Sequence, residues 1–333
     1  MVTIEHSSPG LNSGVSGFPS RFGHKRAKAF LSTLAPLPRP TWLPEKVWPF
    51  QTRGLEVDGS MVAVTEVGQG PTLLFVHTGF WSLIWRDVIT RLAGEFRCIC
   101  LDSPGTGQSA RRAHESITLN HASRAVAAVI ESFELEDATI VVHDLGGPAG
   151  LAAMASAPER LRAIVAVNTF AWQPTGAVFR GMLALMGSGL IREFDAWTQF
   201  LPRVTARTFG VARSMDAATV KAFRAGIGKE GLRSFHYYMR DARKNEDLYR
   251  QLSHAFAGHL RGLPLLTIFG EYNDPLKFQS KWKTLFPDAT QVIVPKGNHF
   301  PMCDNPELVA QTIRSWHREK VKLNKAADRN QED

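Results

Sequence analysis

Short apolar runs alternate with longer amphipathic segments along most of this chain. Residues 72–77 (TLLFVH) and 138–144 (ATIVVHD) are rich in β-branched and aliphatic side chains, as in strands that are buried on both faces of a parallel sheet. The same pattern predicts further strands over 96–102, 161–169, 263–270 and 290–295, and helices over 120–133, 148–158, 278–286 and 306–320. This alternation predicts βαβ units, and therefore a mostly parallel sheet covered by helices.

The two ends of the chain follow other patterns. Residues 54–70 read as a β-hairpin, with Asp58 and Gly59 supplying the turn. Residues 1–40 are rich in Ser, Gly, Pro and basic residues, and we expect a flexible basic leader there. Residues 321–333 are expected to form a polar tail.

The strand pattern stops between residues 170 and 260. Four segments there have helical character: 177–191, 193–201, 217–227 and 232–252. An all-helical insertion in a βαβ series is best explained as a cap over the carboxyl edge of the sheet, where open α/β sheets place their sites. We therefore predict a core made of residues 41–169 and 261–320, with a helical cap over 170–260.

Composition narrows the function classes. The 333 residues are 44% hydrophobic and carry a formal net charge of +8. That charge is dispersed and no nucleic-acid-binding motif accompanies it, so we expect no nucleic-acid partner. No apolar run is long enough to span a membrane, and the start of the chain lacks a signal-peptide pattern, so we expect a cytoplasmic protein. The three cysteines, Cys98, Cys100 and Cys303, are expected to be packed thiols.

The stretch TIVVHDLGGPAG (139–150) carries the candidate chemistry. Asp144 stands where a strand gives way to a helix, on the tight turn known as a nucleophile elbow. A Cβ atom at Gly146 or Gly147 would crowd this turn and the sheet. The start of the following helix and the amide of Leu145 are expected to keep the Asp144 carboxylate ionised.

Two downstream segments complete the chain order nucleophile, acid, base. Asp274 lies just past an apolar strand in IFGEYNDPL, and His299 lies in a loop after the next strand. We expect His299 to act as a general base and Asp274 to hold its imidazole in the correct tautomer. The His, Cys and Asp residues lack the spacing of a zinc site, so we expect no metal and no cofactor.

These motifs resemble those of the α/β-hydrolase superfamily, and within it the haloalkane dehalogenase-like branch, from about residue 45 to 320. The segments that carry the resemblance are VHDLGGPAG (142–150), LDSPGTGQS (101–109), VNTFAWQP (167–174) and GNHFPMCDNPE (297–307). The resemblance implies an α/β-hydrolase fold with a mostly parallel eight-stranded sheet and an inserted helical cap domain.

The resemblance also implies a reaction. Asp144 would displace a leaving group from a small apolar organic substrate and form an alkyl ester, which a water molecule activated by His299 would hydrolyse. The amides of Leu145 and of the Thr78–Gly79 loop would form the oxyanion hole. The oligomeric state is left open.

The sequence departs from this branch at the leaving-group site. Leu145 stands where the branch typically has a tryptophan, and HTGFW (77–81) replaces a loop that carries a second donor, an asparagine. Trp81 and Trp172 are candidate replacement donors of an indole N–H.

Other functions therefore stay open. An epoxide hydrolase uses tyrosine hydroxyls from the cap, for which Tyr237, Tyr238 and Tyr249 are candidates. A binding protein that kept the fold, or a lyase-like enzyme with no covalent step, would also fit these residues.

Overall fold

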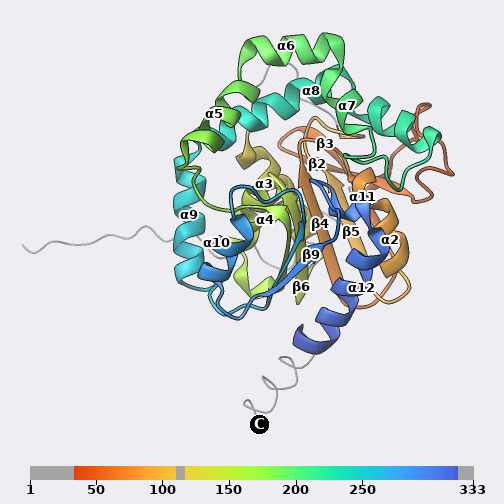
Figure 1. Ribbon diagram of the computed structural model, residues 1–333. Helices are drawn as coiled ribbons and strands as arrows, with labels where there is room; N and C mark the ends of the chain where they lie inside the picture. Colours follow the sequence, from red (N-terminus) through yellow and green to blue (C-terminus); the bar gives the residue numbers. More distant parts are fainter. Residues whose placement is uncertain (1–33, 110–116, 322–333) are drawn as a thin grey trace, which may run out of the picture.

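The computed structural model describes residues 34–109 and 117–321, and its centre is a nine-stranded sheet (Figure 1). Its strands run in the spatial order β1-β2-β3-β5-β4-β6-β7-β8-β9. Their bounds are β1 Ala35–Pro36, β2 Thr52–Val57, β3 Ser60–Val67, β4 Thr72–Thr78, β5 Arg97–Asp102, β6 Ala138–Asp144, β7 Leu161–Thr169, β8 Leu265–Gly270 and β9 Thr290–Val294. Most of the predicted leader, residues 1–33, and residues 322–333 of the predicted tail lie outside the described residues.

The sheet has an antiparallel end and a parallel body. β2 and β3 form the predicted hairpin, in which Asp58 and Gly59 both have positive φ, as the turn requires. From β5 to β9 all pairs are parallel, and β4 at the centre is buried along its whole length. The expected mostly parallel sheet is confirmed, with nine strands instead of eight because the two-residue β1 pairs with β2.

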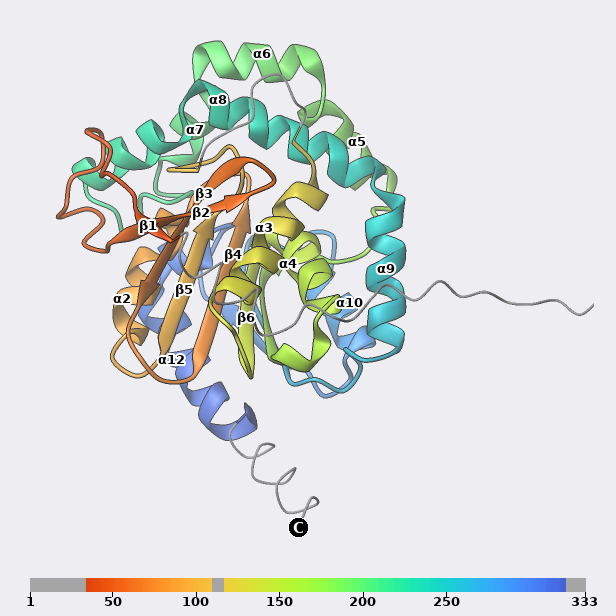
Figure 2. The ribbon, with the colours of Figure 1, turned by 180° about the vertical axis from the view of Figure 1, so that it is seen from behind.

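Helices cover both faces of this sheet (Figures 1 and 2). α3 and α4 pack together on one face, and α2 and α12 pack together on the other. The helices are α2 Arg86–Leu92, α3 Leu119–Ser132, α4 Gly146–Ala155, α5 Ala177–Met186, α6 Gly189–Thr198, α7 Phe200–Thr205, α8 Ala217–Lys244, α9 Glu246–Ala257, α10 Phe278–Leu285, α11 Pro301–Asp304 and α12 Pro306–Trp316. Shorter helical turns span Ser82–Trp85, Pro158–Arg160 and His317–Val321. None of the helices among the described residues combines the length and the apolar character needed to cross a bilayer.

The segment between β7 and β8 is helical throughout, from α5 to α9. α5 and α6 pack on the long helix α8, whereas α9 packs on α4 of the core. The single helix predicted over 177–191 is instead broken at Gly187. A Cβ atom on Gly187 would lie 2.6 Å from Cα of Arg240, and the hydroxyl of Ser188 caps the new helix by accepting from the Ile191 amide.

Candidate active site

Asp144 ends β6 on a strained turn at the carboxyl edge of the sheet. Its φ of 51° lies in the left-handed region, which is unfavourable for a residue with a Cβ atom and persists only where the surroundings enforce it. The hydroxyl of Thr169 donates to the carbonyl oxygen of Asp144 at 2.5 Å and fixes the turn. Because α4 begins two residues later, at Gly146, the positive end of a helix lies next to the Asp144 carboxylate.

The glycines beside Asp144 are required sterically. A Cβ atom on Gly146 would lie 2.4 Å from the carbonyl oxygen of Val76, and one on Gly147 would lie 2.4 Å from that of Phe170. Backbone atoms cannot move aside as a flexible side chain can. The predicted crowding of the turn and of the sheet is therefore confirmed.

The structure brings His299 to the Asp144 carboxylate. The distance between Nε2 of His299 and Oδ2 of Asp144 is 3.2 Å. The Asp144 side chain is 16% exposed and that of His299 is 36% exposed, so a small molecule or a water can reach both groups. Such contact and access are what a nucleophile and a base acting on the same substrate need.

The surroundings favour the charged form of Asp144. Burial alone would raise the pKa of its carboxyl group. The hydrogen bond from His299, the nearby imidazoles of His299 and His143, and the bond from the Leu145 amide outweigh burial and keep the pKa of Asp144 below its ordinary value. The carboxylate is therefore ionised at neutral pH and needs no base to activate it.

The acid predicted for His299 is not in contact with it. Asp274 turns its carboxylate to the start of α10, where it accepts from the amides of Phe278 at 2.6 Å and Gln279 at 3.0 Å. Partial burial raises the pKa of Asp274 in spite of these two bonds. Within the described part of the chain, no hydrogen bond joins Asp274 to His299. The predicted orienting role of Asp274 therefore does not fit the geometry, because neighbouring residues on this loop point in different directions.

Asn273 occupies the position expected for the acid. Its Nδ2 atom lies 3.2 Å from Nδ1 of His299. An asparagine amide can be turned so that its oxygen accepts from the Nδ1–H group, which leaves Nε2 free to take a proton. Asn273 can thus orient the ring, but it is uncharged and stabilises the imidazolium form less than a carboxylate would.

Two buried imidazoles support the loop that carries His299. The amide of Phe80 donates to Nε2 of His77 at 3.2 Å, so the proton of this neutral ring sits on Nδ1. The Nδ1 atoms of His77 and His143 are 3.0 Å apart, so His77 donates and His143 accepts. The remaining proton of His143, on Nε2, is then donated to the carbonyl oxygen of His299 at 2.8 Å.

Both rings are held neutral by their surroundings. Burial, together with the nearby His299, lowers the pKa of His77 to about 3. Burial first, and then the neighbouring imidazoles of His299 and His77, keep the pKa of His143 well below its ordinary value. This hydrogen-bonded chain could not be predicted from the sequence, because its members are far apart along the polypeptide.

The predicted oxyanion residues lie around the elbow. Thr78 pairs with Asp144 across β4 and β6, and its buried hydroxyl is within hydrogen-bond distance of Ser103. Gly79 follows with φ of +113°, and a Cβ atom there would lie 2.7 Å from the ring of Phe235. The amide of Leu145 already points at the Asp144 carboxylate.

Comparison with known proteins identifies the family. Residues 71–306 match the family described as alpha/beta hydrolase fold. The chain belongs to this family. Haloalkane dehalogenase 2 of Mycobacterium tuberculosis (strain H37Rv) is 24% identical over 284 residues, which cover 80% of this chain and 95% of that protein. A protein of Shewanella oneidensis named cis-3-alkyl-4-alkyloxetan-2-one decarboxylase is 24% identical over 290 residues, covering 83% of this chain and 91% of that protein.

Solved structures agree on the fold. A loop variant of the haloalkane dehalogenase DbeA from Bradyrhizobium elkanii superposes with a TM-score of 0.70 at 18% identity, covering 85% of this chain and 99% of that one. The resemblance of this α/β-hydrolase to the haloalkane dehalogenase-like branch, which the motifs indicated, is thus confirmed.

Two candidate donors of this α/β-hydrolase are engaged elsewhere. The indole N–H of Trp81 donates to the carbonyl oxygen of Phe223 in the cap at 3.1 Å, and the side chain is buried. The hydroxyl of Tyr238 donates to the carbonyl oxygen of Pro104 at 2.8 Å. The predicted donor roles of Trp81 and Tyr238 therefore do not fit their hydrogen bonds. Each of these bonds joins the cap to the core, which sequence spacing could not reveal.

The hydroxyl of Tyr249 is also engaged, since it donates to the carbonyl oxygen of Ala242 at 2.8 Å. The remaining candidate donors, Trp172 and Tyr237, lie against charged side chains. The ring of Trp172 faces Nζ of Lys281 at 4.5 Å, and the ring of Tyr237 faces the guanidinium groups of Arg192 and Arg240. The ring of Phe80, in contrast, stacks on the rings of both Phe235 and Phe300. The ring of Phe300 in turn contacts the imidazole of His299 edge-on. The surroundings of the reacting pair are thus aromatic and apolar.

Proposed function

We propose that this α/β-hydrolase breaks a carbon–halogen bond of a small apolar substrate through a covalent ester on Asp144. One observation carries the proposal: an ionised, accessible carboxylate on an elbow, 3.2 Å from an imidazole. A carboxylate with a lowered pKa is a ready nucleophile for a saturated carbon. The aromatic wall beside it suits an apolar substrate.

The steps balance without a cofactor. The carboxylate of Asp144 forms a C–O bond to the substrate carbon while the carbon–halogen bond breaks and the halide leaves with the electron pair. His299 then takes a proton from a water molecule, whose oxygen attacks the carbonyl carbon of the ester. The amides of Leu145 and Gly79 are assigned to the resulting oxyanion. Collapse of this intermediate breaks the bond to the alkoxide, which takes the proton from His299 and leaves as the alcohol. The second proton of the water is released to solvent, which restores the Asp144 carboxylate.

Trapping the ester tests the proposal. In the His299→Gln variant the second half of the reaction is blocked, so incubation with a brominated alkane should add one alkyl group to the protein and release one bromide. Intact-mass and peptide mass spectrometry locate the group. The double variant Asp144→Asn/His299→Gln is the matched control and should stay unmodified. An unmodified single variant, or equal labelling of the double variant, would refute the proposal.

A second candidate is the decarboxylation of an oxetan-2-one, the substrate in the name of the Shewanella relative. Two observations favour it. The halide donors are missing, since Leu145 has no side-chain N–H and the indole of Trp81 is bonded to Phe223. In addition, Asn273 in place of a carboxylate gives little help in activating water.

Neither the missing halide donors nor the neutral Asn273 hinders the reaction of an oxetan-2-one. Asp144 attacks C4, the saturated carbon bonded to the ring oxygen, and this C–O bond breaks. The leaving group is then a carboxylate, which is stable without indole donors. Loss of CO₂ then supplies the electron pair of a C=C bond, and the Asp144 carboxylate departs, so no water is consumed. Gas chromatography should detect an alkene from a cis-3,4-dialkyloxetan-2-one. The appearance of only the 3-hydroxy acid would exclude this candidate.

A further inference from the structure

Two neighbouring helices of the cap, α5 and α6, expose apolar side chains to solvent. In Figures 1 and 2, α6 lies at the edge of the molecule farthest from the sheet, and α5 lies beside it, above α9. Six exposed residues define what we call the outer cap face: Val178, Met182 and Leu185 on α5, and Leu190, Phe194 and Trp197 on α6. Their exposed fractions range from 45% to 81%.

The spacing of these residues is regular. On each helix they stand at positions i, i+4 and i+7, which places them on one side of the helix. The opposite side already packs on the protein, through Phe179 and Leu183 in α5 and Ala196 in α6. A row of exposed apolar residues along one side of each of two neighbouring helices, unlike scattered apolar residues, marks a surface that binds a partner.

The cap also carries most of the net positive charge of the protein. Residues 170–260 contain thirteen Lys and Arg against seven Asp and Glu, a net of +6 out of +8 for the whole chain. An apolar face set in a basic region is the pattern of proteins that bind acidic membrane surfaces.

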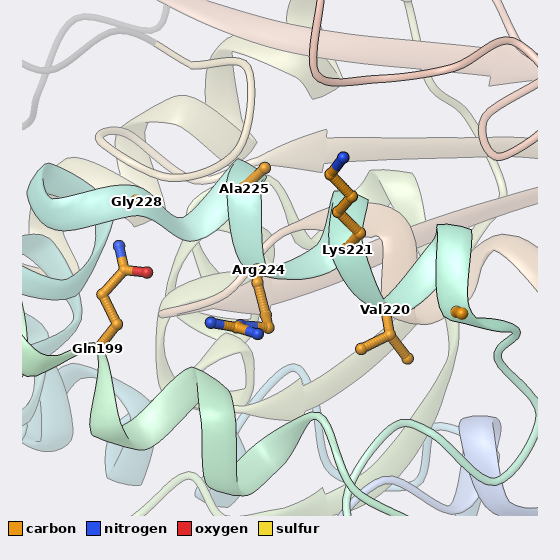
Figure 3. A pocket seen from close by; sticks show the side chains of 7 residues that line it. Gln199, Val220, Lys221, Arg224, Ala225 and Gly228 are labelled. Carbon is orange, nitrogen blue, oxygen red and sulfur yellow. The ribbon is translucent and has the colours of Figure 1, made fainter.

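Three cations of α8 lie beside the tryptophan end of this face. Nζ of Lys229 lies 4.0 Å from the ring centre of Trp197. Lys221 and Arg224 line a cavity of about 400 Å³ together with Gln199, two residues after Trp197. Figure 3 shows the guanidinium group of Arg224 extending from α8 toward Gln199.

These cations are not neutralised by the protein. Within the described ranges, none of the three forms an ion pair, and the buried Nε atom of Arg224 has no hydrogen-bond partner. The acidic Glu193 of α6, in contrast, is paired with Arg192 and Arg233. The surface next to the outer cap face therefore presents positive charge that has no acidic partner among the described residues, which suits the phosphate groups of lipids.

We infer that the outer cap face docks on an anionic phospholipid bilayer. The apolar side chains of α5 and α6 enter the boundary between headgroups and acyl chains, with Trp197 at the level of the headgroups. Lys221, Arg224 and Lys229 contact lipid phosphates. A second copy of the chain is a poorer occupant, because it would bring two cap segments of net charge +6 together. The inference does not depend on the reaction at Asp144.

Vesicle sedimentation of the full-length protein tests this inference. We expect binding to vesicles of three parts phosphatidylcholine and one part phosphatidylglycerol, and binding at least about tenfold weaker to phosphatidylcholine alone. The triple variant Leu190→Ser/Phe194→Ser/Trp197→Ser and the charge variant Lys221→Glu/Lys229→Glu should each lower the partition coefficient more than about tenfold.

Two controls isolate the cap. Ile293→Ser removes an apolar side chain that is 57% exposed on the edge strand β9, and it should leave the partition coefficient within about twofold of the unaltered protein. Replacing four of the five Lys and Arg residues of the leader (Arg21, Lys25, Arg26 and Lys28) with serine tests the other basic segment and should preserve binding.

Three results would overturn the inference. The first is absence of binding to the anionic vesicles. The second is binding that is lost with the leader variant and kept by both cap variants. The third, from sedimentation velocity without lipid, is a dimer that the triple serine variant converts to a monomer, because a second copy would then cover the face.

Discussion

Replacing Asn273 with aspartate should speed the hydrolysis of the ester on Asp144. The Nδ2 atom of Asn273 lies 3.2 Å from Nδ1 of His299, so a carboxylate of nearly the same shape can take its place and accept from the ring. A negative charge there stabilises the imidazolium that forms when His299 takes a proton from water. The first step, attack by Asp144, gains nothing from this charge.

The magnitude follows from distance and exposure. Two opposite charges about 4 Å apart attract by about 4 kcal/mol at an effective dielectric constant of about 20. The His299 side chain is 36% exposed, so solvent screens much of this interaction. A retained stabilisation of about 1.4 kcal/mol corresponds to about a tenfold faster hydrolysis on the high-pH plateau.

Single-turnover kinetics with a brominated alkane separate the two steps. Rapid quenching and intact-mass analysis follow the growth and the decay of the alkyl-enzyme at several pH values. The matched control is Asp274→Asn, which alters the neighbouring carboxylate that lies at the start of α10. We expect the control to decay within about twofold of the unaltered protein. If Asp274→Asn abolished the decay and Asn273→Asp left the decay rate unchanged, the assignment of Asn273 to the imidazole would be refuted.

Three further predictions concern the supports of the site. Because burial lowers the pKa of His143, only the unfolded chain is protonated there below about pH 6.5, so stability present above this pH is lost as the pH falls. Urea titrations should show a loss of about 4 kcal/mol between about pH 7.5 and 5, about 2 kcal/mol from each of His77 and His143. His143→Asn should remove about half of this loss, and the exposed control His254→Asn should retain all of it. Gly147→Ala should cost about 3 kcal/mol of unfolding free energy, whereas Gly181→Ala, with no atom within 4 Å of the new Cβ, should not destabilise the protein. Trp81→Phe should lower the stability by about 1 kcal/mol, because the Phe223 carbonyl loses its donor, and leave the alkylation rate within about threefold; a large fall in that rate would restore Trp81 as a leaving-group donor.

The sheet and the elbow could be predicted because local physics determines them. Continuous apolar runs such as residues 138–144 suit only strands buried on both faces, and Asp58 with Gly59 suits a two-residue hairpin turn. The glycines after Asp144 are required by backbone atoms of neighbouring strands. In each case local sterics require this residue type, and one backbone conformation satisfies them.

The partners of the site residues could not be predicted in the same way. Asn273 and Asp274 are adjacent on an irregular loop, and only the path of that loop decides which of them faces His299. Trp81 seemed free to donate because its acceptor, the carbonyl of Phe223, lies 142 positions away in the cap. Hydrogen bonds between distant segments depend on how the segments pack, which periodicity does not encode.

The two departures at this site affect different steps of the proposed reaction. The lack of halide donors near Leu145 slows the departure of a halide, and the neutral Asn273 slows the attack of water on the ester. Attack by Asp144 itself is well supported, since its pKa is lowered and its turn is fixed by Thr169. The site therefore supports the attack of Asp144 on the substrate better than the hydrolysis of the resulting ester. It favours substrates whose leaving group is stable and whose covalent intermediate can decompose without water. Comparing alkyl-ester decay with alkene formation in the same preparation therefore measures directly which step this site serves.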